Sequence, residues 1–471
     1  MKKIMTLTAI FCFTCLQLCS GHPANKEEFG KAYEEVRMTA LAAQTCAGSY
    51  VPEGKANEYR YLKRYGFNIT PYAQEVDGVK VNFMVATNPK PYDGRRLAVL
   101  AVRGSADKND WHINLKTKQV PFATQEVPSI GVTGQMLPKN HEENKIPMIH
   151  QGFNAYTQAA LKCKVDIDGD GKVDDIAAKL KSEPDLLLLI TGHSLGGAVA
   201  TLYGEYLVRS GVPREQIPVI TFGAPAVGNA AFAAAYGDKI DLTRLVTSYD
   251  PIPGSLQSFF GGYKQFGKLK KYKLPSTYTD FQHPIAFYFD LALKDYYTTV
   301  DQGVEAGWLP QIPLAQLKGE APLVALALTA KKEGDYERYM PDIRRFVLEE
   351  YLMMLPRYIV IENNIDKEKD TMSFNDLMDK AHKNGAQYLL VIDADIRNIK
   401  QTDKLYVSIN QGIFTVPDSR LITMDSGNTR ITFQQGTTQA TIALVENSRD
   451  AMKKYLPFAR QSVIPRWKEL F

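Results

Sequence analysis

The chain has 471 residues, of which 45% are hydrophobic and 23% are charged, and its formal net charge at pH 7 is +4. This length exceeds one ordinary hydrophobic core and predicts two domains of unequal size. Lys and Arg are scattered among acidic residues and form no basic runs of the kind that nucleic-acid-binding proteins carry, so we expect no nucleic acid partner.

Residues 1–21 are predicted to form a secretory signal peptide. Lys2 and Lys3 precede the apolar stretch IMTLTAIFCFTCLQL, which small residues follow, and this order is typical of such a peptide. We therefore expect an exported protein, which is secreted, periplasmic or associated with an outer membrane; an uncleaved membrane anchor is the alternative. Cys19 would suit a lipoprotein signal, but the large Leu18 precedes it, so lipid anchoring stays open.

Two cysteines, Cys46 and Cys163, remain outside the predicted signal peptide. In an exported protein they fit one disulfide bond and two buried thiols equally well. Their pairing stays open.

Residues 22–305 are predicted to form the larger domain. A helical stretch over 27–44 is followed by an alternating, strand-like pattern around an Asp77–Gly78 turn. Four apolar runs of strand length come next: LAVLAVRGS, LLLLITG, IPVITFGAP and LTRLVTSYDP. Such runs are typical of strands buried on both faces, and their alternation with helices predicts an α/β fold with a mainly parallel sheet.

Residues 306–320 are predicted to form a linker, and residues 321–471 a second, smaller α/β domain. The stretch WLPQIPLAQLKGEAP holds three prolines and little periodicity, which favours a boundary there. The predicted strands beyond it are LVALALT, YIVIEN, QYLLVIDADI, LYVSINQGIF and RLITMDSG. The predicted helices are DYERYMPDIRRFVLEEYLMML, SFNDLMDKAHKNGA and NSRDAMKKYLPFA.

The stretch LLLLITGHSLGGAVATLYG sets Ser194 between Gly192 and Gly196, after an apolar strand and before an alanine-rich helix. The glycines lack side chains that would clash across a sharp turn, so the chain can present the hydroxyl at the strand tip. The helix, which starts near Leu195, would direct its N–H groups and positive dipole end at a developing oxyanion. The pattern predicts a catalytic nucleophile; a structural glycine turn is the alternative.

His283 is the predicted general base. A serine nucleophile needs a base, and in hydrolases with this turn the chain order is serine, acid, histidine. Of seven histidines, only His283 and His382 follow Ser194. His382 lies in the charged helical stretch DKAHKNG of the second domain, where a solvated surface position is expected.

Asp250 is the predicted acid that orients His283. Among the aspartates between serine and histidine, only Asp250 directly follows an apolar strand, in RLVTSYDPIP. A carboxylate at the carboxyl end of a strand lies on the same sheet edge as the serine. The alternative is a loop aspartate that caps a turn.

Five stretches in this order resemble class 3 lipases, the α/β-hydrolase family that includes filamentous-fungal triacylglycerol lipases. They are VRGSADKNDWHINL, IHQGF, ITGHSLGGAVATL, TFGAPAVGNAAFA and DPIP. The resemblance covers approximately residues 30–300 and implies the α/β-hydrolase fold and ester hydrolysis through an acyl-enzyme. It further implies that Ser105 and Leu195 form the oxyanion hole and that residues 106–114 form a lid. Trp111 in that lid would contact lipid; surface packing is the alternative.

The stretch DIDGDGKVDDIA resembles the first half of an EF-hand calcium loop. Asp166, Asp168 and Asp170 alternate before Gly171, but Ala177 stands at the twelfth position, where a bidentate glutamate is usual. A structural Ca²⁺ site and a solvated acidic turn both fit this pattern. Catalysis through Ser194 would require no cofactor in either case.

The leading functional prediction is a secreted serine hydrolase that cleaves carboxylic esters of lipids and contacts a lipid surface. A triacylglycerol lipase, a phospholipase and an esterase for short-chain or phenolic esters all fit. The alternative from another class is a non-catalytic lipid-binding or envelope-assembly protein on a hydrolase scaffold. The second domain weakly resembles periplasmic α/β domains of bacterial outer-membrane assembly lipoproteins, which would imply an envelope protein partner.

Overall fold

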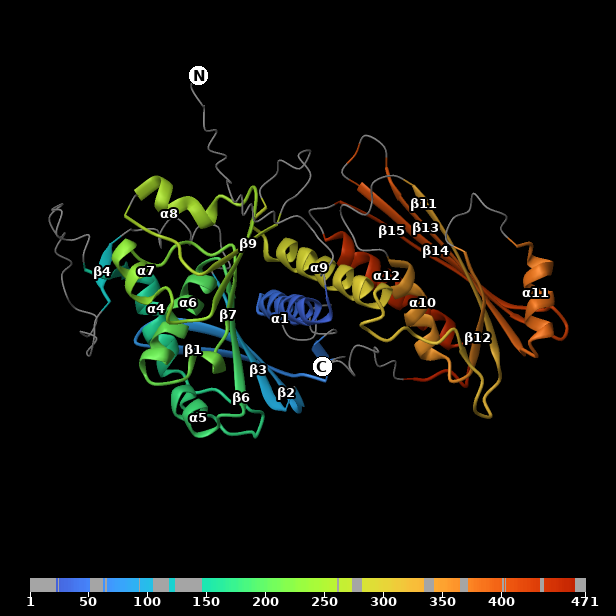
Figure 1. Ribbon diagram of the computed structural model, residues 1–471, viewed down its shortest axis with the longest axis horizontal. Coiled ribbons are helices and arrows are strands. Elements are labelled where there is room, and N and C mark those ends of the chain that lie inside the picture. The colour runs from blue at the N-terminus through green and yellow to red at the C-terminus, as the bar shows by residue number, and fades with distance from the viewer. Residues whose placement is uncertain are drawn as a thin grey trace, which may run out of the picture.

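The computed structural model of this chain has two large β-sheets with helices between them (Figure 1), and a small third sheet of two strands, β4 and β5. The structure describes residues 23–461 except 24, 51–61, 64–65, 93, 105–117, 123–145, 261, 273–281, 334–342, 365–371, 400–401, 403 and 433–435. One large sheet has seven strands and the other has six. The predicted α/β fold class is confirmed.

The first sheet, in the order β1-β2-β3-β6-β7-β8-β9, is antiparallel at one edge and parallel from β3 onward. β1 and β2 form a hairpin at Asp77–Gly78, where both residues have a positive φ. The parallel order brings the carboxyl ends of β3, β6, β7 and β8 to one edge. The bounds are β1 Asn68–Val76, β2 Val79–Tyr92, β3 Arg95–Val102, β6 Leu186–His193, β7 Val219–Phe222, β8 Leu242–Thr247 and β9 Lys268–Tyr272.

Helices cover both faces of this sheet. Residues of α4 (Gln151–Lys162), α5 (Ile176–Ser182) and α6 (Leu195–Arg209) share a hydrophobic cluster with one face. Residues of α1 (Lys26–Gly48) and α9 (Ile285–Glu305) share another cluster with the opposite face. The smaller elements are β4 Gln119–Pro121, β5 Met148–His150, the 3₁₀ turn Arg214–Gln216, α7 Ala230–Tyr236 and α8 Ile252–Phe260.

The second sheet has the order β10-β12-β11-β13-β14-β15. β10 (Ala315–Gln316) lies inside the predicted linker. Its two residues form a strand there because they pair with β12. α12 (Thr437–Lys453) begins before its predicted stretch, since polar threonines hide its first turn in the sequence. The other bounds are β11 Val324–Glu333, α10 Ile343–Met354, β12 Tyr358–Asn364, α11 Phe374–Lys383, β13 Tyr388–Asn398, β14 Lys404–Thr415 and β15 Leu421–Thr432.

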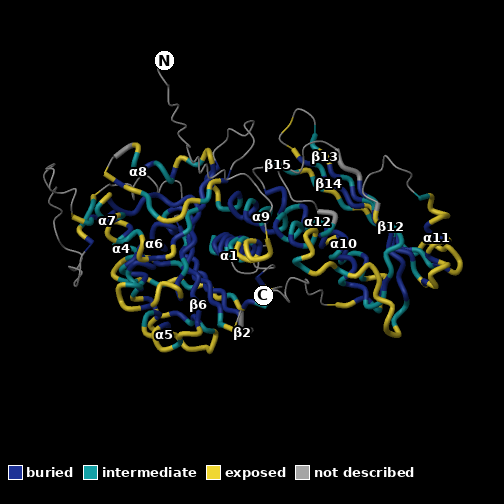
Figure 2. Tube along the Cα trace, in the orientation of Figure 1, coloured by how far each residue is buried: buried dark blue, intermediate teal, exposed yellow. Residues whose placement is uncertain are grey.

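One hydrophobic core runs from the first sheet to the second. The same buried cluster includes Leu189 of β6, Phe289 of α9, Val445 of α12 and Ile392 of β13. Figure 2 shows buried segments gathered where α1 and α9 lie between the sheets. We call the part built on the first sheet, residues 25–305, the N-terminal unit, and the part built on the second, residues 315–461, the C-terminal unit. A shared core predicts that the units unfold together.

Three sequence expectations concern export and redox state. The predicted signal peptide, residues 1–21, lies outside the described residues. No helix in the described part of the chain has both the length and the apolar character needed to span a membrane. Cys46 and Cys163 are both buried and unpaired with each other, so the structure has two buried thiols.

Candidate active site

Ser194 lies at a strained turn between β6 and α6. Its φ is 59° and its ψ is −127°, a conformation that non-glycine residues adopt at a cost. A Cβ on Gly192 would lie 2.2 Å from the Gly196 carbonyl oxygen, and a Cβ on Gly196 would lie 2.2 Å from the Val102 oxygen. Both glycines are therefore required by close backbone contacts, which hold the turn in place.

The Ser194 hydroxyl is buried and makes no hydrogen bond to any described residue. It does not cap α6, although Ser194 stands at the N-cap position. Its backbone N–H instead donates to the Phe222 carbonyl at 2.9 Å. An uncapped hydroxyl at a helix N-terminus can approach a carbonyl carbon while the helix dipole favours negative charge beside it.

Asp250 and His283 are in direct contact. His283 Nδ1 lies 2.8 Å from Asp250 Oδ2. Asp250 also accepts hydrogen bonds from the Tyr288 hydroxyl at 2.6 Å and from the Ile252 backbone N–H at 2.9 Å. The Asp250 side chain is fully buried. Three donors therefore stabilise its carboxylate, and the carboxylate fixes the orientation of the imidazole.

The Asp250–His283 pair lies beside the strand that neighbours Ser194. Phe222 ends β7 and accepts the Ser194 N–H, and Gly223 follows it. A Cβ on Gly223 would lie 2.6 Å from Asp250 Oδ2 and 3.2 Å from His283 Nδ1. The structure thus brings all three predicted residues to one edge of the sheet. Because Asp250 holds Nδ1, Nε2 is the ring nitrogen that can exchange a proton with a hydroxyl.

A second pair of side chains, Tyr50 and His193, links this edge to the end of β3. His193 Nε2 lies 2.6 Å from the His283 carbonyl oxygen, and its Nδ1 lies 3.1 Å from the Tyr50 hydroxyl. The Gly104 N–H donates to the same hydroxyl at 3.1 Å. Burial lowers the pKa of His193, so we assign a neutral ring that donates from Nε2 and accepts at Nδ1.

The sequence alone did not identify Tyr50, His193 or Tyr288 as supporting residues. Tyr50 is 143 positions from His193, so no local spacing relates them. Tyr288 lies on the first turns of α9, close after His283, and that proximity was the one available signal.

The structure describes one of the two predicted oxyanion-hole residues and none of the predicted lid. Leu195 is the first residue of α6 and is partly exposed beside Ser194. Ser105 and Trp111 lie outside the described residues. His382, the histidine set aside, is exposed on α11 of the C-terminal unit.

The histidine of the IHQGF stretch, His150, has a structural environment. Its Nδ1 accepts hydrogen bonds from the backbone N–H groups of Gly152 and Phe153, at 3.1 and 3.2 Å, and so caps α4. Burial lowers its pKa to about 4. A neutral capping histidine explains this part of the motif without a role in chemistry.

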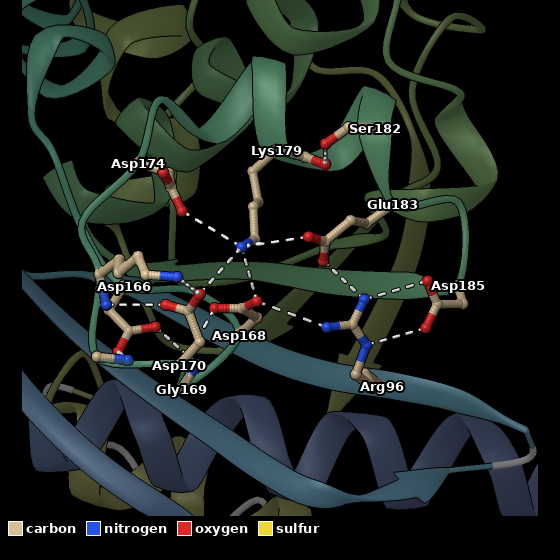
Figure 3. A network of polar contacts seen from close by, with 12 residues as sticks. Arg96, Asp166, Asp168, Gly169, Asp170, Asp174, Lys179, Ser182, Glu183 and Asp185 are labelled. Atoms are coloured by element: carbon tan, nitrogen blue, oxygen red, sulfur yellow. Dashed lines mark hydrogen bonds and ion pairs between the residues drawn. The ribbon is translucent and has the colours of Figure 1, made fainter.

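The three aspartates of the acidic loop lie together, with carboxylate oxygens within 4.8 Å of one another. Figure 3 shows Lys179 of α5 reaching into this group. Its Nζ lies 2.8 Å from Asp168 Oδ2 and 3.7 Å from Asp170 Oδ2. Asp166 accepts hydrogen bonds from the backbone N–H groups of Gly169 and Gly171 instead. An ammonium group thus stands where a cation of the loop would be expected.

Arg96 extends this network to the start of β3. Its guanidinium lies 2.6 Å from Glu183 Oε2, 2.9 Å from Asp185 Oδ2 and 3.5 Å from Asp168 Oδ2 (Figure 3). Hydrogen bonding to Asp168 and neighbouring acids raises the pKa of Lys179. Both cations are therefore fixed as charged groups among carboxylates.

Comparison with known proteins identifies the region that carries the serine. Residues 99–259 match the family described as Lipase (class 3), which confirms the predicted resemblance. This segment includes Ser194 and Asp250 and ends before His283. The family match therefore covers two of the three residues that the structure brings together.

Curated relatives align with part of the same region. The chain is 35% identical over 166 residues to "Phospholipase A(1) DAD1, chloroplastic" of Arabidopsis thaliana, covering 34% of this chain and 33% of that protein. It is 29% identical over 171 residues to "Secreted mono- and diacylglycerol lipase 1" of Fusarium solani, covering 36% and 42%. The chain thus spans about a third of the length of the first curated relatives that it matches.

Solved lipase structures show a distant likeness. The Rhizomucor miehei triacylglyceride lipase aligns with 20% identity and a TM-score of 0.36, over 52% of this chain and 81% of that chain. A triacylglycerol lipase described as having a serine protease triad aligns with 22% identity and a TM-score of 0.37, over 54% and 82%. Similarity at this level says nothing about substrate.

Proposed function

We propose that this chain, whose residues 99–259 match the class 3 lipase family, hydrolyses carboxylic esters of lipids. Ser194 is the nucleophile, His283 the general base and Asp250 the acid that orients it. The observation that carries the proposal is the contact of 2.8 Å between Asp250 Oδ2 and His283 Nδ1, beside the strained turn of Ser194. A structural glycine turn would not require a buried carboxylate–imidazole pair next to it.

The proposed reaction proceeds through an acyl-enzyme. His283 accepts the Ser194 proton at Nε2 while the serine oxygen bonds to the ester carbonyl carbon. The bond to the leaving alcohol then breaks, and His283 returns the proton to that alcohol. Water, deprotonated by His283, then attacks the acyl carbon; the bond from that carbon to the Ser194 oxygen breaks, His283 returns the proton to this oxygen, and the carboxylic acid is released. Asp250 stays ionised and stabilises the imidazolium that forms in each step.

The backbone N–H of Leu195 is proposed as one oxyanion donor. It stands at the N-terminus of α6, where helical N–H groups have no intrahelical partner. Ser105 is proposed as the second donor, and it directly follows Gly104, whose N–H is held by Tyr50. Loss of one such donor typically costs about 3 kcal/mol of transition-state stabilisation.

A lipid ester is proposed as the substrate class. The relatives include proteins named as phospholipases and as acylglycerol lipases, so head group and acyl length are not assigned. Export is also proposed, supported by the pattern of residues 1–21 and by the word "secreted" in the names of fungal relatives. Lipid-surface contact and an envelope partner for the C-terminal unit stay predictions.

The decisive experiment is labelling by a fluorophosphonate probe. The full chain should become labelled, and Ser194→Ala should not, while its circular dichroism and melting temperature stay close to those of the parent. Ser210→Ala, at the other end of α6, is a matched control that should label normally. Labelling of Ser194→Ala would show that another residue is the nucleophile.

A nitrophenyl-ester assay distinguishes the enzyme from a non-catalytic scaffold. The proposal expects turnover that is lost in Ser194→Ala. If the intact chain binds lipid vesicles but neither reacts with the probe nor cleaves any ester in a panel of acyl lengths and head groups, the scaffold alternative is correct. The same panel would assign the substrate among acylglycerols, phospholipids and short-chain esters.

A further inference from the structure

Helix α9 connects the candidate active site to the C-terminal unit. It begins at Ile285, two residues after His283, and its Tyr288 donates a hydrogen bond to Asp250. Two residues further along, Asp290 is 5% exposed and belongs to no part of the reaction proposed above. The helix α9 therefore carries both Tyr288, which supports the Asp250–His283 pair, and a buried acidic side chain outside that pair.

Asp290 caps a helix of the C-terminal unit. α12 begins after Gly436, which has a φ of 88° and no side chain to cap the helix. Asp290 Oδ1 accepts the backbone N–H of Gln439 at 3.0 Å, and Oδ2 lies 3.4 Å from the Thr437 hydroxyl. A carboxylate at a helix N-terminus satisfies orphan N–H groups and interacts favourably with the helix dipole. The capping residue of α12 is thus supplied by α9.

A second hydrogen bond joins α12 to the first turn of α9. Gln439 Nε2 donates to the Ala286 carbonyl at 3.0 Å. Ala286 is three residues after His283 in the chain. The first turn of α12 therefore contacts α9 on both sides of Tyr288, at Ala286 and at Asp290. Figure 1 shows α9 and α12 side by side between the two sheets.

Two contacts from the N-terminal unit hold the backbone at His283 and at the residue before it. The His283 carbonyl is held by His193, and the Gln282 carbonyl accepts from the Thr247 hydroxyl at 3.3 Å. Both of these contacts come from the N-terminal unit and both hold carbonyl groups. The backbone after His283 runs directly into α9, so the position of α9 fixes its direction. The first turn of α9 is in turn held by α12.

We propose that the C-terminal unit positions His283, through the contacts that Asp290 and Gln439 make between α9 and α12. The inference rests on the proposed function, since it assigns the C-terminal unit a part in the same reaction. Asp290 and Gln439 are positioning residues, because they touch neither substrate nor the reacting atoms. Misplacement of a catalytic group by about 1 Å can cost about 100-fold in rate, so a small shift of the first turn of α9 would lower kcat.

The test compares two helix caps of the C-terminal unit. Asp290→Asn replaces one of the two oxygens that accept hydrogen bonds from the first turn of α12 by an amide donor, with little change in volume. Ser373→Ala removes the capping box that Ser373 and Asp376 form at α11. Both should lower the melting temperature. Of these two variants, only Asp290→Asn should lower kcat, because Ser373→Ala leaves the start of α9 unchanged. We expect kcat to fall by about tenfold, with KM within about twofold of the parent. Gln439→Ala, at a partly exposed position, should lower kcat in the same way but less.

The outcomes separate this inference from the proposed function. If the intact chain is active and Asp290→Asn and Gln439→Ala keep the parental kcat, the C-terminal unit does not position His283. If Ser373→Ala lowers kcat as much as Asp290→Asn, the effect is one of general stability and the inference is wrong. If Asp290→Asn fails to fold, the other two variants decide. A lower kcat in Gln439→Ala than in Ser373→Ala supports the inference, and equal kcat values overturn it. An intact chain without probe labelling or turnover would overturn the proposed function itself.

Discussion

The two ends of the same strands have opposite chemical characters. At the amino ends of β3 and β6, Arg96 and Asp185 belong to a network in which cations and carboxylates contact one another. At the carboxyl ends, Ser194 has a strained backbone and a buried hydroxyl without a hydrogen bond to any described residue. The eight residues of β6 separate these two environments.

This contrast separates stability from function within one sheet. Groups with satisfied partners contribute to the folded state, although exposed ion pairs contribute little each. A strained turn and an unpaired buried hydroxyl cost stability and persist only where the surrounding structure holds them. The comparison predicts that changes at the carboxyl ends alter rate more than stability, and that changes at the amino ends do the reverse.

The largest effect on rate, after loss of the nucleophile, is expected for Asp250→Asn. Asparagine keeps one oxygen, which can still accept from the Ile252 N–H, while its amide NH2 can donate to the Tyr288 hydroxyl, so the fold should persist. It cannot stabilise an imidazolium and it favours the wrong tautomer of His283, so kcat should fall by about 10³–10⁴-fold. Steady-state kinetics with an ester substrate measures this.

Asp185→Asn at the amino end of β6 is the matched control for Asp250→Asn. It removes one charge from an exposed carboxylate that contacts Arg96, so kcat should not change. A comparable loss of activity in both variants would contradict the contrast between the two ends.

Glu205 of α6 is an exception to the rule that charged groups near the amino ends have satisfied partners. Its burial leads us to expect that the stability of the protein depends on pH. The preceding Gly204 lies against Val219 at the start of β7. Both carboxylate oxygens of Glu205 are buried without a hydrogen-bond partner among the described residues, and burial raises its pKa to about 8. Arg209, Asp238 and Lys239 are the charged groups that act on it. This carboxyl therefore favours its neutral form in the folded protein.

Glu205→Gln should remove that dependence on pH. The folded protein binds a proton that the unfolded chain releases between pH 4.5 and about 8, so the stability of the parent falls as pH rises through that range. The variant should match the parent below pH 4.5 and exceed it at pH 9 by approximately 2–4 kcal/mol. Denaturant unfolding at both pH values measures the difference; equal stabilities at pH 9 would refute it.

Tyr288→Phe should have a smaller effect on rate than Asp250→Asn. The substitution removes the hydroxyl that donates to Asp250 at 2.6 Å and that accepts the Thr247 N–H at 3.3 Å. One of three donors to Asp250 is lost, so kcat should fall by about tenfold and the free energy of unfolding by about 1 kcal/mol. Kinetics and denaturant unfolding together measure this, with Tyr296→Phe, a buried tyrosine further along α9, as the control. Equal kcat in the two variants would show that the hydroxyl of Tyr288 does not support Asp250.

The sequence predicted those features that depend on local pattern. The apolar runs that became β3, β6, β7 and β8 are buried on both faces, so hydrophobicity alone locates them. Ser194 has a signal in its flanking glycines, and His283 and Asp250 followed by elimination, because few histidines and strand-ending aspartates are present. The structure brings these three together although the chain order alone gives no distance between them.

The sequence could not predict contacts that join distant parts of the chain. Tyr50 lies in the turn that follows α1, and Asp290 lies on α9 among buried residues that are mostly apolar; nothing local marks the partners of either. The ion pair of Lys179 with Asp168 had a signal that was missed. The acidic loop lacks a twelfth-position carboxylate, and a lysine follows two residues later, on the helix after the loop.

Lys179→Met should give the smallest effect, and on stability alone. The ammonium, 12% exposed, lies within 4.0 Å of Asp168, Asp170, Asp174 and Glu183. Its loss leaves these carboxylates to repel one another, so the free energy of unfolding should fall by about 1 kcal/mol while kcat is unchanged. In the parent, Ca²⁺ should not alter the melting temperature, because the ammonium already neutralises Asp168 and Asp170. A rise of several degrees on addition of millimolar Ca²⁺ to the parent would instead show that a metal ion displaces Lys179 from the loop.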